Sequence, residues 1–326
     1  MTDLRTVRAS GPADLLALVP SLLGFHPDES VVVLTLGDAR HPFHARVDLP
    51  REQLGIEQLA GCLAEVASRH GVTRLAAALY TRDARLADAV ARELDHRLDR
   101  AGVDLACVVR ADGERWWAFD GRADAPGTPY DVGSHPLMAR AVVEGTVVLG
   151  SRQELADSLV GDPAEADRVG RLAAARHVPG GRAPTRRHLV REGHWVRGRV
   201  CRFLADGQPL DTPDLARLLG AITLSLEVRD VAWAEMSHDN AERHVDLWRD
   251  AVRRAPAGLR AGPAALLGFA AWLSGNGALA WCAVERAQEA DPGHGLAALL
   301  TQALAGAVPP SVWRPIPREA LTLFER

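Results

Sequence analysis

The spacing of apolar residues changes along the chain, and these changes predict alternating helices and strands. Residues 12–23 carry apolar side chains at helical spacing. Residues 31–36 form a short β-branched run that is typical of a buried strand, whereas residues 41–49 alternate apolar and polar side chains. Because the turn sequence Gly37-Asp38 separates the two runs, they are predicted to pair as an antiparallel hairpin.

Further along, the pattern predicts consecutive βαβ units and therefore a sheet with a parallel core. The expected elements are a helix near 55–69, a strand at 74–80, a helix near 83–100 and a strand at 103–109. Asp112-Gly113 then forms a hairpin turn signal ahead of a strand at 115–119. The N-terminal half is thus predicted to be an α/β domain whose mixed sheet combines a parallel core with two antiparallel hairpin strands.

After Pro136 the chain is predicted to be helical apart from a brief strand at 147–149. Asp162 and Glu165 have the spacing of a capping box at a helix start. Residues 177–185 contain four turn or breaker residues and predict an interdomain linker. We therefore expect an α/β domain over 1–178 and an all-helical domain over 179–326.

The small residues between Ala264 and Pro292 are spaced as in a tetratricopeptide repeat, which predicts one helical hairpin of that kind. One interpretation is that residues 264–305 form a groove that binds a partner protein. The alternative is a hairpin that packs only against neighbouring helices, because repeat surfaces usually need about three units. Both interpretations stay open from the sequence.

The composition excludes several chemistries. All 38 basic residues are arginine, so the chain has no lysine for a Schiff base, a P-loop or a kinase-type site. The net charge of −4 gives no overall basic field for nucleic acid or an acidic membrane. No HExxH, GxSxG or CxxC motif occurs.

The same composition predicts a cytoplasmic protein. The four cysteines lie far apart, which argues against disulfides and against a cysteine zinc site. No stretch has the roughly twenty apolar residues that a membrane helix needs, and residues 1–10 carry charges where a signal peptide would be apolar. We expect no membrane association.

The densest group of reactive side chains is the loop 24–30, which contains His26, Asp28, Glu29 and Ser30. If the strand at 31–36 is antiparallel to the strand at 43–49, and the latter is parallel to the strands at 74–80 and 103–109, this loop lies at the carboxyl edge of the parallel strands, where open α/β sheets bind ligands. The side chains expected at the same edge are Asp48, Thr81, Arg82, Asp83, Arg110, Asp112 and Trp116.

At this edge His26 could act as a general base or a metal ligand, with Asp28 or Glu29 orienting it. Arg82 or Arg110 could hold an anion. The alternative is that Asp28 and Ser30 only form a turn or a cap. His41 and His44 point to opposite faces of a strand and cannot chelate one ion together, so we assign no metal site; the sequence identifies no cofactor.

Residues 182–202 contain seven arginines and only one acid, Glu192, and form the one local basic patch. Apolar residues recur on one face of this segment, so most of these arginines are expected on a solvated outer face. Nucleic-acid binding through them is a less favoured interpretation.

Residues 19–33, which read VPSLLGFHPDESVVV, resemble the actinobacterial family known as domain of unknown function 4192. The resemblance continues through Arg229-Asp230 and through 266–292, and the lack of lysine is in keeping with such a source. The family implies no activity, cofactor or catalytic residue.

Three functional hypotheses follow from the sequence. The first is a non-catalytic interaction or regulatory protein whose helical half binds a partner. The second is an enzyme, hydrolytic or phosphate-handling, with its pocket around His26, Asp28, Glu29 and the arginines Arg82 and Arg110. The third is nucleic-acid binding through residues 182–202.

Overall fold

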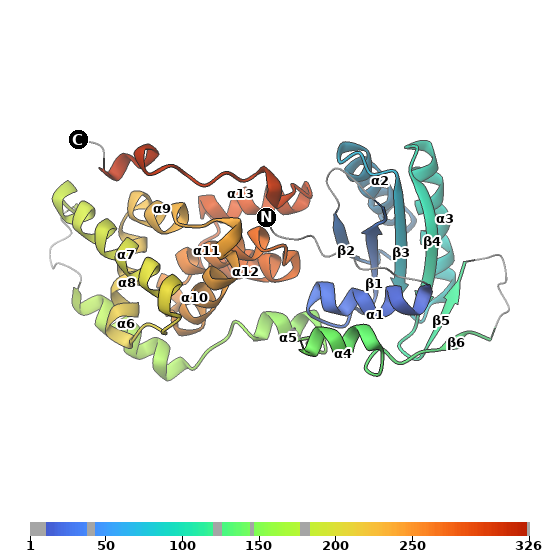
Figure 1. Ribbon diagram of the computed structural model, residues 1–326, viewed down its shortest axis with the longest axis horizontal. Helices are drawn as coiled ribbons and strands as arrows, with labels where there is room; N and C mark the ends of the chain where they lie inside the picture. Colours follow the sequence, from blue (N-terminus) through green and yellow to red (C-terminus); the bar gives the residue numbers. More distant parts are fainter. Residues whose placement is uncertain (1–10, 38–42, 120–125, 144–146, 177–182, 325–326) are drawn as a thin grey trace. The chain divides into compact units, whose positions relative to one another are not determined.

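The computed structural model describes residues 11–37, 43–119, 126–143, 147–176 and 183–324. The described chain falls into two compact units, which divide between Arg152 and Gln153 (Figure 1). The first, here the α/β unit, contains a six-stranded sheet, and the second, here the helical unit, contains helices only among its described residues. An α/β half followed by a helical half is therefore confirmed.

The units divide earlier than position 178, where we expected the boundary. Helix α6 (Pro163–Arg176) belongs to the helical unit because it packs against α8 (Thr212–Leu224) and α10 (Ala241–Arg254). Most of the expected linker, residues 177–182, lies outside the described residues, as do His41 and Arg182.

The sheet has the strand order β2-β1-β3-β4-β5-β6 (Figure 1). Its strands are β1 (Ser30–Thr35), β2 (His44–Asp48), β3 (Arg74–Tyr80), β4 (Asp104–Ala111), β5 (Arg115–Ala118) and β6 (Thr128–Pro129). Strands β3 and β4 pair in parallel, and every other neighbouring pair is antiparallel. This is the predicted mixed sheet with a parallel core.

Two details of the sheet differ from the sequence prediction. Strand β6 was not expected, because a two-residue strand that contains a proline has almost no sequence signal. The strand expected at 147–149 is reduced to one isolated bridge, between Phe25 and Leu149. Both segments are held by partners distant in sequence, so local periodicity could not identify them.

Helices cover both faces of the sheet, and strands β1 and β3 are therefore buried along almost their whole length. On one face, alternate residues such as Val32, Ala78 and Val109 form a core with the apolar side of α1 (Pro12–Leu23). Helix α4 (Pro136–Val143) packs beside α1. Helices α2 (Gln53–Arg69) and α3 (Ala84–Arg100) lie together on the other face (Figure 1).

The helical unit is built around α11 (Ala261–Leu273), in which every residue from Gly262 to Leu273 is buried. The other helices of this unit are α5 (Arg152–Asp157), α6, α7 (Arg186–Asp206), α8, α9 (Leu226–Ala234), α10, α12 (Gly277–Ala290) and α13 (Gly295–Ala305). Short 3-10 turns at Pro310–Val312, Arg318–Ala320 and Thr322–Phe324 follow α13. Helix α11 contacts α8, α10, α12 and α13, which accounts for the burial of its residues from Gly262 onwards.

Helices α11 and α12 form the predicted hairpin, joined by a turn in which Gly275 has a φ of +84°. Gly268 lies where the two helices approach closely, since a Cβ added there would come within 3.2 Å of Val284 Cγ2. Small residues at these positions therefore permit the close packing that the sequence pattern indicated.

None of the four cysteines forms a disulfide, and Cys62 is exposed whereas Cys282 is buried.

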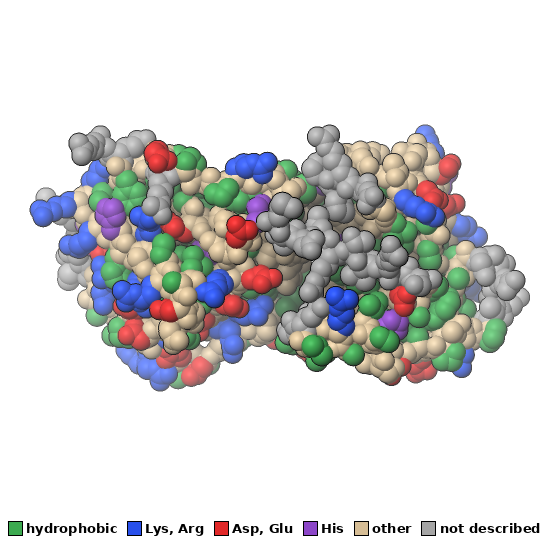
Figure 2. All heavy atoms as spheres, viewed as in Figure 1, with side chains coloured by type: hydrophobic (Ala, Val, Ile, Leu, Met, Phe, Trp, Pro, Cys, Tyr) green, Lys and Arg blue, Asp and Glu red, His purple; other side chains and the backbone are tan. Residues whose placement is uncertain are grey.

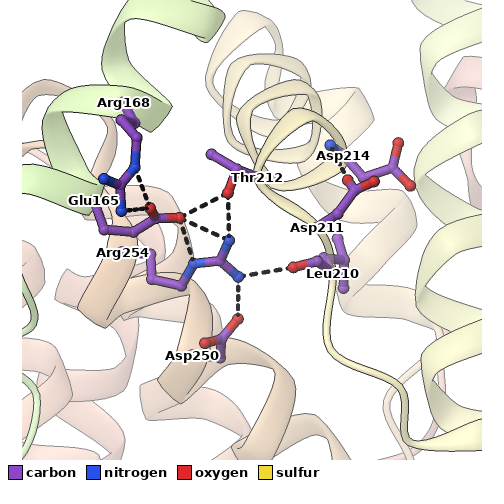
Figure 3. A network of polar contacts seen from close by, with 8 residues as sticks. All are labelled: Glu165, Arg168, Leu210, Asp211, Thr212, Asp214, Asp250 and Arg254. Atoms are coloured by element: carbon purple, nitrogen blue, oxygen red, sulfur yellow. Dashed lines mark hydrogen bonds and ion pairs between the residues drawn. The ribbon is translucent and has the colours of Figure 1, made fainter.

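An ion-pair cluster, here the α6–α8–α10 cluster, joins three helices of this unit (Figure 3). Glu165 on α6 accepts a hydrogen bond from Thr212 Oγ1 at 2.9 Å and pairs with Arg254 Nη2 at 2.9 Å. Arg254 also pairs with Asp250 at 3.0 Å and donates to the carbonyl oxygen of Leu210 at 2.8 Å. Glu165 thus connects α6 to the other two helices instead of completing the expected capping box.

Candidate functional site at the sheet edge

The register of the central strands decides where the loop 24–30 lies. Ser30 at the start of β1 pairs with Tyr80 at the end of β3, and Tyr80 pairs with Ala111 at the end of β4. The start of β1 and the ends of the two parallel strands are therefore neighbours at one edge of the sheet. This is the strand arrangement that the ligand-binding edge of an open α/β sheet requires.

Local structure positions His26 at this edge. Gly24 ends α1 in the left-handed conformation, with a φ of 78°, which turns the chain towards the sheet. The backbone N–H of His26 donates to the carbonyl oxygen of Leu149 at 3.0 Å. In return, the N–H of Leu149 donates to the carbonyl oxygen of Gly24 at 2.8 Å. The backbone of the loop is thus fixed, while the imidazole of His26 is exposed.

A cavity of about 400 Å³, here the sheet-edge cavity, opens beside this loop. Its walls are formed by Pro20, His26, Pro27, Asp28, Tyr80, Thr81, Arg82, Ala111, Asp112, Gly113, Tyr130, Asp131, Val132 and Gly133. Five of the side chains that we expected at this edge line it: His26, Asp28, Thr81, Arg82 and Asp112. Its volume lies within the range typical of small-molecule sites.

Other expected residues lie near the edge but outside the cavity lining. Glu29 accepts a hydrogen bond from Thr81 Oγ1 at 2.9 Å, and its φ of 38° is rare for a residue with a side chain. Asp83 caps α3 by accepting from two backbone N–H groups. The exposed Asp48 carboxylate pairs with the mostly buried side chain of Arg46 at 2.6 Å, and Ser30 is fully buried.

Arg110 and Trp116 were expected in the same pocket, but neither lines it. Successive residues of a strand point to opposite faces, and Ala111 lies on the face covered by α1, so Arg110 lies on the other face. There its guanidinium stacks on its cross-strand partner Trp117, with 3.6 Å from Cζ to the ring centroid. Trp116 packs against the core under α1.

Sequence reasoning missed the wall that Tyr130, Asp131, Val132 and Gly133 contribute. These residues follow β6, which returns along β5 and is fixed by a hydrogen bond from the N–H of Tyr130 to the carbonyl oxygen of Glu114. The turn residues of the segment were a visible signal, but its place beside the edge depends on pairing with β5. Tyr80 was also missed, although it directly precedes Thr81.

Two carboxylates of the cavity, those of Asp112 and Asp131, are held by backbone groups. Asp112 Oδ1 accepts from the N–H groups of Glu114 at 2.9 Å and Arg115 at 2.8 Å, and Asp131 Oδ1 accepts from the N–H of Gly133 at 2.9 Å. Burial acts to raise the pKa of Asp112, but these two hydrogen bonds and the charges of Arg110 and Arg82 outweigh it and lower the pKa. Asp112 is therefore ionised at neutral pH.

Two phenols lie close together in the wall. Burial raises the pKa of Tyr80 well above its ordinary value, with a further contribution from Tyr130. Burial also raises the pKa of Tyr130, the charge of Asp112 adds to the increase, and a backbone hydrogen bond with Gly113 opposes it. Tyr80 is 7% exposed, and its buried hydroxyl has no hydrogen-bond partner among the described residues. Such a group is costly to bury unless a ligand or water satisfies it.

No cluster of three or more His, Cys, Asp or Glu side chains within the described ranges could hold a metal ion. The side chain of Asp28 makes no hydrogen bond or ion pair with any described residue, and neither does the imidazole of His26. Both groups therefore remain available to a molecule in the cavity.

The arginine-rich segment 182–202 forms most of α7, and many of its charges are neutralised by acids. Arg197 pairs with Glu235 at 2.9 Å and Arg199 with Asp214 at 3.0 Å. Glu192 pairs with Arg191 and, from α8, with Arg217. On the face of the helical unit visible in Figure 2, basic and acidic side chains are interspersed. These pairings reduce the positive field available to a phosphate backbone.

The helical hairpin presents little apolar surface. Every residue of α11 from Gly262 to Leu273 is buried, and most of the apolar residues of α12, which packs against α11 and α13, are buried as well. Among the large hydrophobic side chains described in 264–305, Leu299 alone is exposed, at 59%. The hairpin thus packs mainly against helices of its own unit.

None of the described helices is both long and apolar enough to span a lipid bilayer. Together, the fold and the site define a two-unit protein in which a mixed α/β sheet carries a polar cavity at its edge and a separate unit is helical. A family model described as Domain of unknown function (DUF4192) matches residues 12–311, so the chain belongs to this family. Comparison with curated proteins and with solved structures found no match.

Proposed function

We propose that this protein binds a small molecule in the sheet-edge cavity of its α/β unit. The observation that carries the proposal is the convergence of free polar groups on one cavity at the carboxyl edge of the parallel strands. The side chains of His26 and Asp28 are exposed there and have no hydrogen-bond or ion-pair partner among the described residues, and the Tyr80 hydroxyl is buried in the wall and likewise has none among them. A buried polar group such as the Tyr80 hydroxyl is seldom left unsatisfied unless a ligand or water satisfies it, and the exposed side chains of His26 and Asp28 are open to the same bound molecule.

A cavity-filling substitution tests this proposal. Val132 is a half-buried wall residue on the segment after β6, and Val132→Trp would place a large ring in the cavity. Val143→Trp is the matched control, because Val143 is 88% exposed and does not line the cavity. Both full-length variants and the parent chain would be titrated calorimetrically with a panel of amines, sugars, nucleotides and small anions.

We expect at least one class of compound to bind the parent and Val143→Trp but not Val132→Trp. Binding should also raise the unfolding midpoint, since a ligand of the native state stabilises it by mass action. Equal binding to the parent and to Val132→Trp would contradict the proposal. A panel without any binder would also contradict it.

Hydrolysis at the same cavity is the second candidate function, favoured by the exposed imidazole of His26 beside Asp28. A general base must remain accessible to substrate, and catalytic hydrogen bonds often tighten only when substrate binds. If the protein is a hydrolase, His26→Ala should abolish turnover of the bound compound while its dissociation constant changes little. Phosphate handling has less support, because Arg110 lies on the other face of the sheet.

Partner binding through a tetratricopeptide-like hairpin at 264–305 has less support than ligand binding, because its apolar side chains are largely covered. Nucleic-acid binding through α7 is likewise less favoured, since many of its arginines are paired with acids.

We retain a cytoplasmic location and an actinobacterial source as proposals. The widely spaced cysteines support the first, and the lysine-free composition supports the second.

A further inference from the structure

We infer that the ligand of the sheet-edge cavity is a small organic cation that carries one or more protonated amines, because three carboxylates and two phenols surround the cavity with only one arginine. This inference rests on the proposed function and specifies its ligand class. Asp28, Asp112 and Asp131 provide the carboxylates, and Arg82 is the only lysine or arginine in the lining. The fixed charge of the lining is thus negative, which attracts a cation and repels an anion.

The carboxylates are placed for an extended cation rather than for a metal ion. In the part of the chain that the structure describes, no three acidic, histidine or cysteine side chains come together as a metal site. Asp112 and Asp131 each use one oxygen to hold a backbone turn, and their second oxygens have no described partner. Asp28 keeps both carboxylate oxygens available. Carboxylates that do not converge on one point suit N–H donors distributed along a molecule.

The aromatic wall supplies the second, independent observation. Tyr80 is more than nine-tenths buried in the core cluster under α1, Tyr130 packs against that cluster, and both line the cavity. Tyr130 itself is hydrogen-bonded to Gly113 and lies near Asp112, both of which line the cavity. The unpartnered Tyr80 hydroxyl can accept a hydrogen bond from an ammonium group. The phenol rings can add cation–π attraction.

An anionic ligand would meet the opposite balance of charge. Arg82 is exposed at the rim, and the guanidinium of Arg110 is stacked on Trp117 on the other face of the sheet. A phosphate in the cavity would therefore have one cationic partner and three carboxylates around it. Desolvating an anion beside carboxylates is unfavourable unless a bound cation neutralises them.

Charge substitutions in the full-length protein test the ligand class. Spermidine and putrescine are the cationic probes, pyrophosphate is the anionic probe and glucose is the neutral probe, all titrated calorimetrically at low and moderate salt. The variants are Asp28→Asn and Arg82→Gln in the lining. Asp95→Asn is the matched control, because Asp95 is an exposed carboxylate on α3, outside the cavity, and its loss changes the net charge by the same amount.

We expect an amine to bind the parent chain and Asp95→Asn equally. Asp28→Asn should weaken this binding by about threefold to tenfold, the effect of losing one partly solvated charge-assisted contact. Arg82→Gln should strengthen it by about twofold to fivefold, and added salt should weaken it.

Two results would overturn this inference and leave the proposed function intact. One is binding of pyrophosphate that Arg82→Gln abolishes and Asp28→Asn strengthens, which would make the ligand an anion. The other is binding of glucose but of no amine. Equal weakening of amine binding by Asp28→Asn and Asp95→Asn would show surface attraction only and would also overturn the inference. If no probe binds, and the wider panel is equally blank, the proposed function itself fails.

Discussion

At the scale of single residues, the buried His244 on α10 links the stability of the helical unit to pH. It is fully buried, and its Nδ1 lies 3.3 Å from Trp248 Nε1, an atom that can only donate. The proton of the neutral ring is therefore on Nε2, which donates to the carbonyl oxygen of Glu235 at 3.3 Å. Burial lowers the pKa of His244 to about 4, against 6.5 for an ordinary histidine, although Glu235 opposes the shift.

This pKa predicts that the helical unit loses stability in mild acid. Between pH 6.5 and about 4 the unfolded chain binds a proton at His244 that the folded chain does not, so the free energy of unfolding decreases as the pH falls. The total decrease in the free energy of unfolding is on the order of 3 kcal/mol, and it is complete once the pH is below the folded-state pKa. Urea unfolding across this pH range would measure it.

His244→Gln should flatten that pH dependence, because the titrating group is gone, even though the variant is less stable at pH 7. His96→Gln is the matched control, since His96 is an exposed residue of α3. An unchanged slope in His244→Gln would contradict the assignment.

At the scale of elements, the α6–α8–α10 cluster holds α6 in the helical unit (Figure 3). Hydrogen bonds from Arg168 and Thr212, together with the charge and hydrogen bond of Arg254, lower the pKa of Glu165 to about 2. A lowered carboxyl pKa contributes stability above the unfolded value of 4.5, and this contribution is lost as the pH falls towards 2. The pairing therefore operates fully at neutral pH.

Glu165→Gln should destabilise the helical unit by about 1–3 kcal/mol at pH 7, because Arg254 would keep its charge in a partly buried place without its main partner. Arg168→Gln should cost less than about 0.5 kcal/mol, since that arginine approaches the same carboxylate from the solvent side. Chemical denaturation of both variants at pH 7 would compare them. Equal effects would mean that the cluster does not join the helices.

Helix packing also makes a prediction at two glycines. A Cβ at Gly161 would lie 1.9 Å from the carbonyl oxygen of Arg253 at the end of α10, so Gly161→Ala must push the segment before α6 away. We expect Gly161→Ala to lower the free energy of unfolding by about 1–3 kcal/mol. Gly220 lies within α8 with nothing within 4 Å of an added Cβ, so Gly220→Ala should stabilise by about 0.5–1 kcal/mol. Thermal unfolding of the two variants should show opposite shifts.

At the scale of the whole molecule, the chain contains two separate cores. Leu79 of β3 is fully buried in the α/β unit, and Leu266 of α11 is fully buried in the helical unit. Each Leu→Ala substitution should cost about 2–5 kcal/mol in its own core. Hydrogen exchange should show faster opening of the sheet in Leu79→Ala and of α10 to α12 in Leu266→Ala. Faster exchange across both units in both variants would mean that they unfold as one.

Local patterns in the sequence determined most of the elements. The β-branched run identified β1, the alternating run identified β2, and apolar residues at helical spacing identified α1. Strand direction also followed from short-range signals, since hairpin turns and βαβ order fix which strand ends are neighbours. For that reason Thr81 and Asp112 could be expected at the edge beside His26, and all three line the same cavity.

Only the tertiary structure decided which face of the sheet each edge residue serves and which distant segment closes the cavity. A step of one residue along β4 moves a side chain to the opposite face, so Ala111 lines the cavity and Arg110 does not. Tyr130 and Asp131 reach the edge because β6 pairs with β5, and Glu165 draws α6 into the helical unit by pairing with Arg254. Such contacts join residues far apart in sequence, and their free energy depends on the assembled core, so no local pattern encodes them.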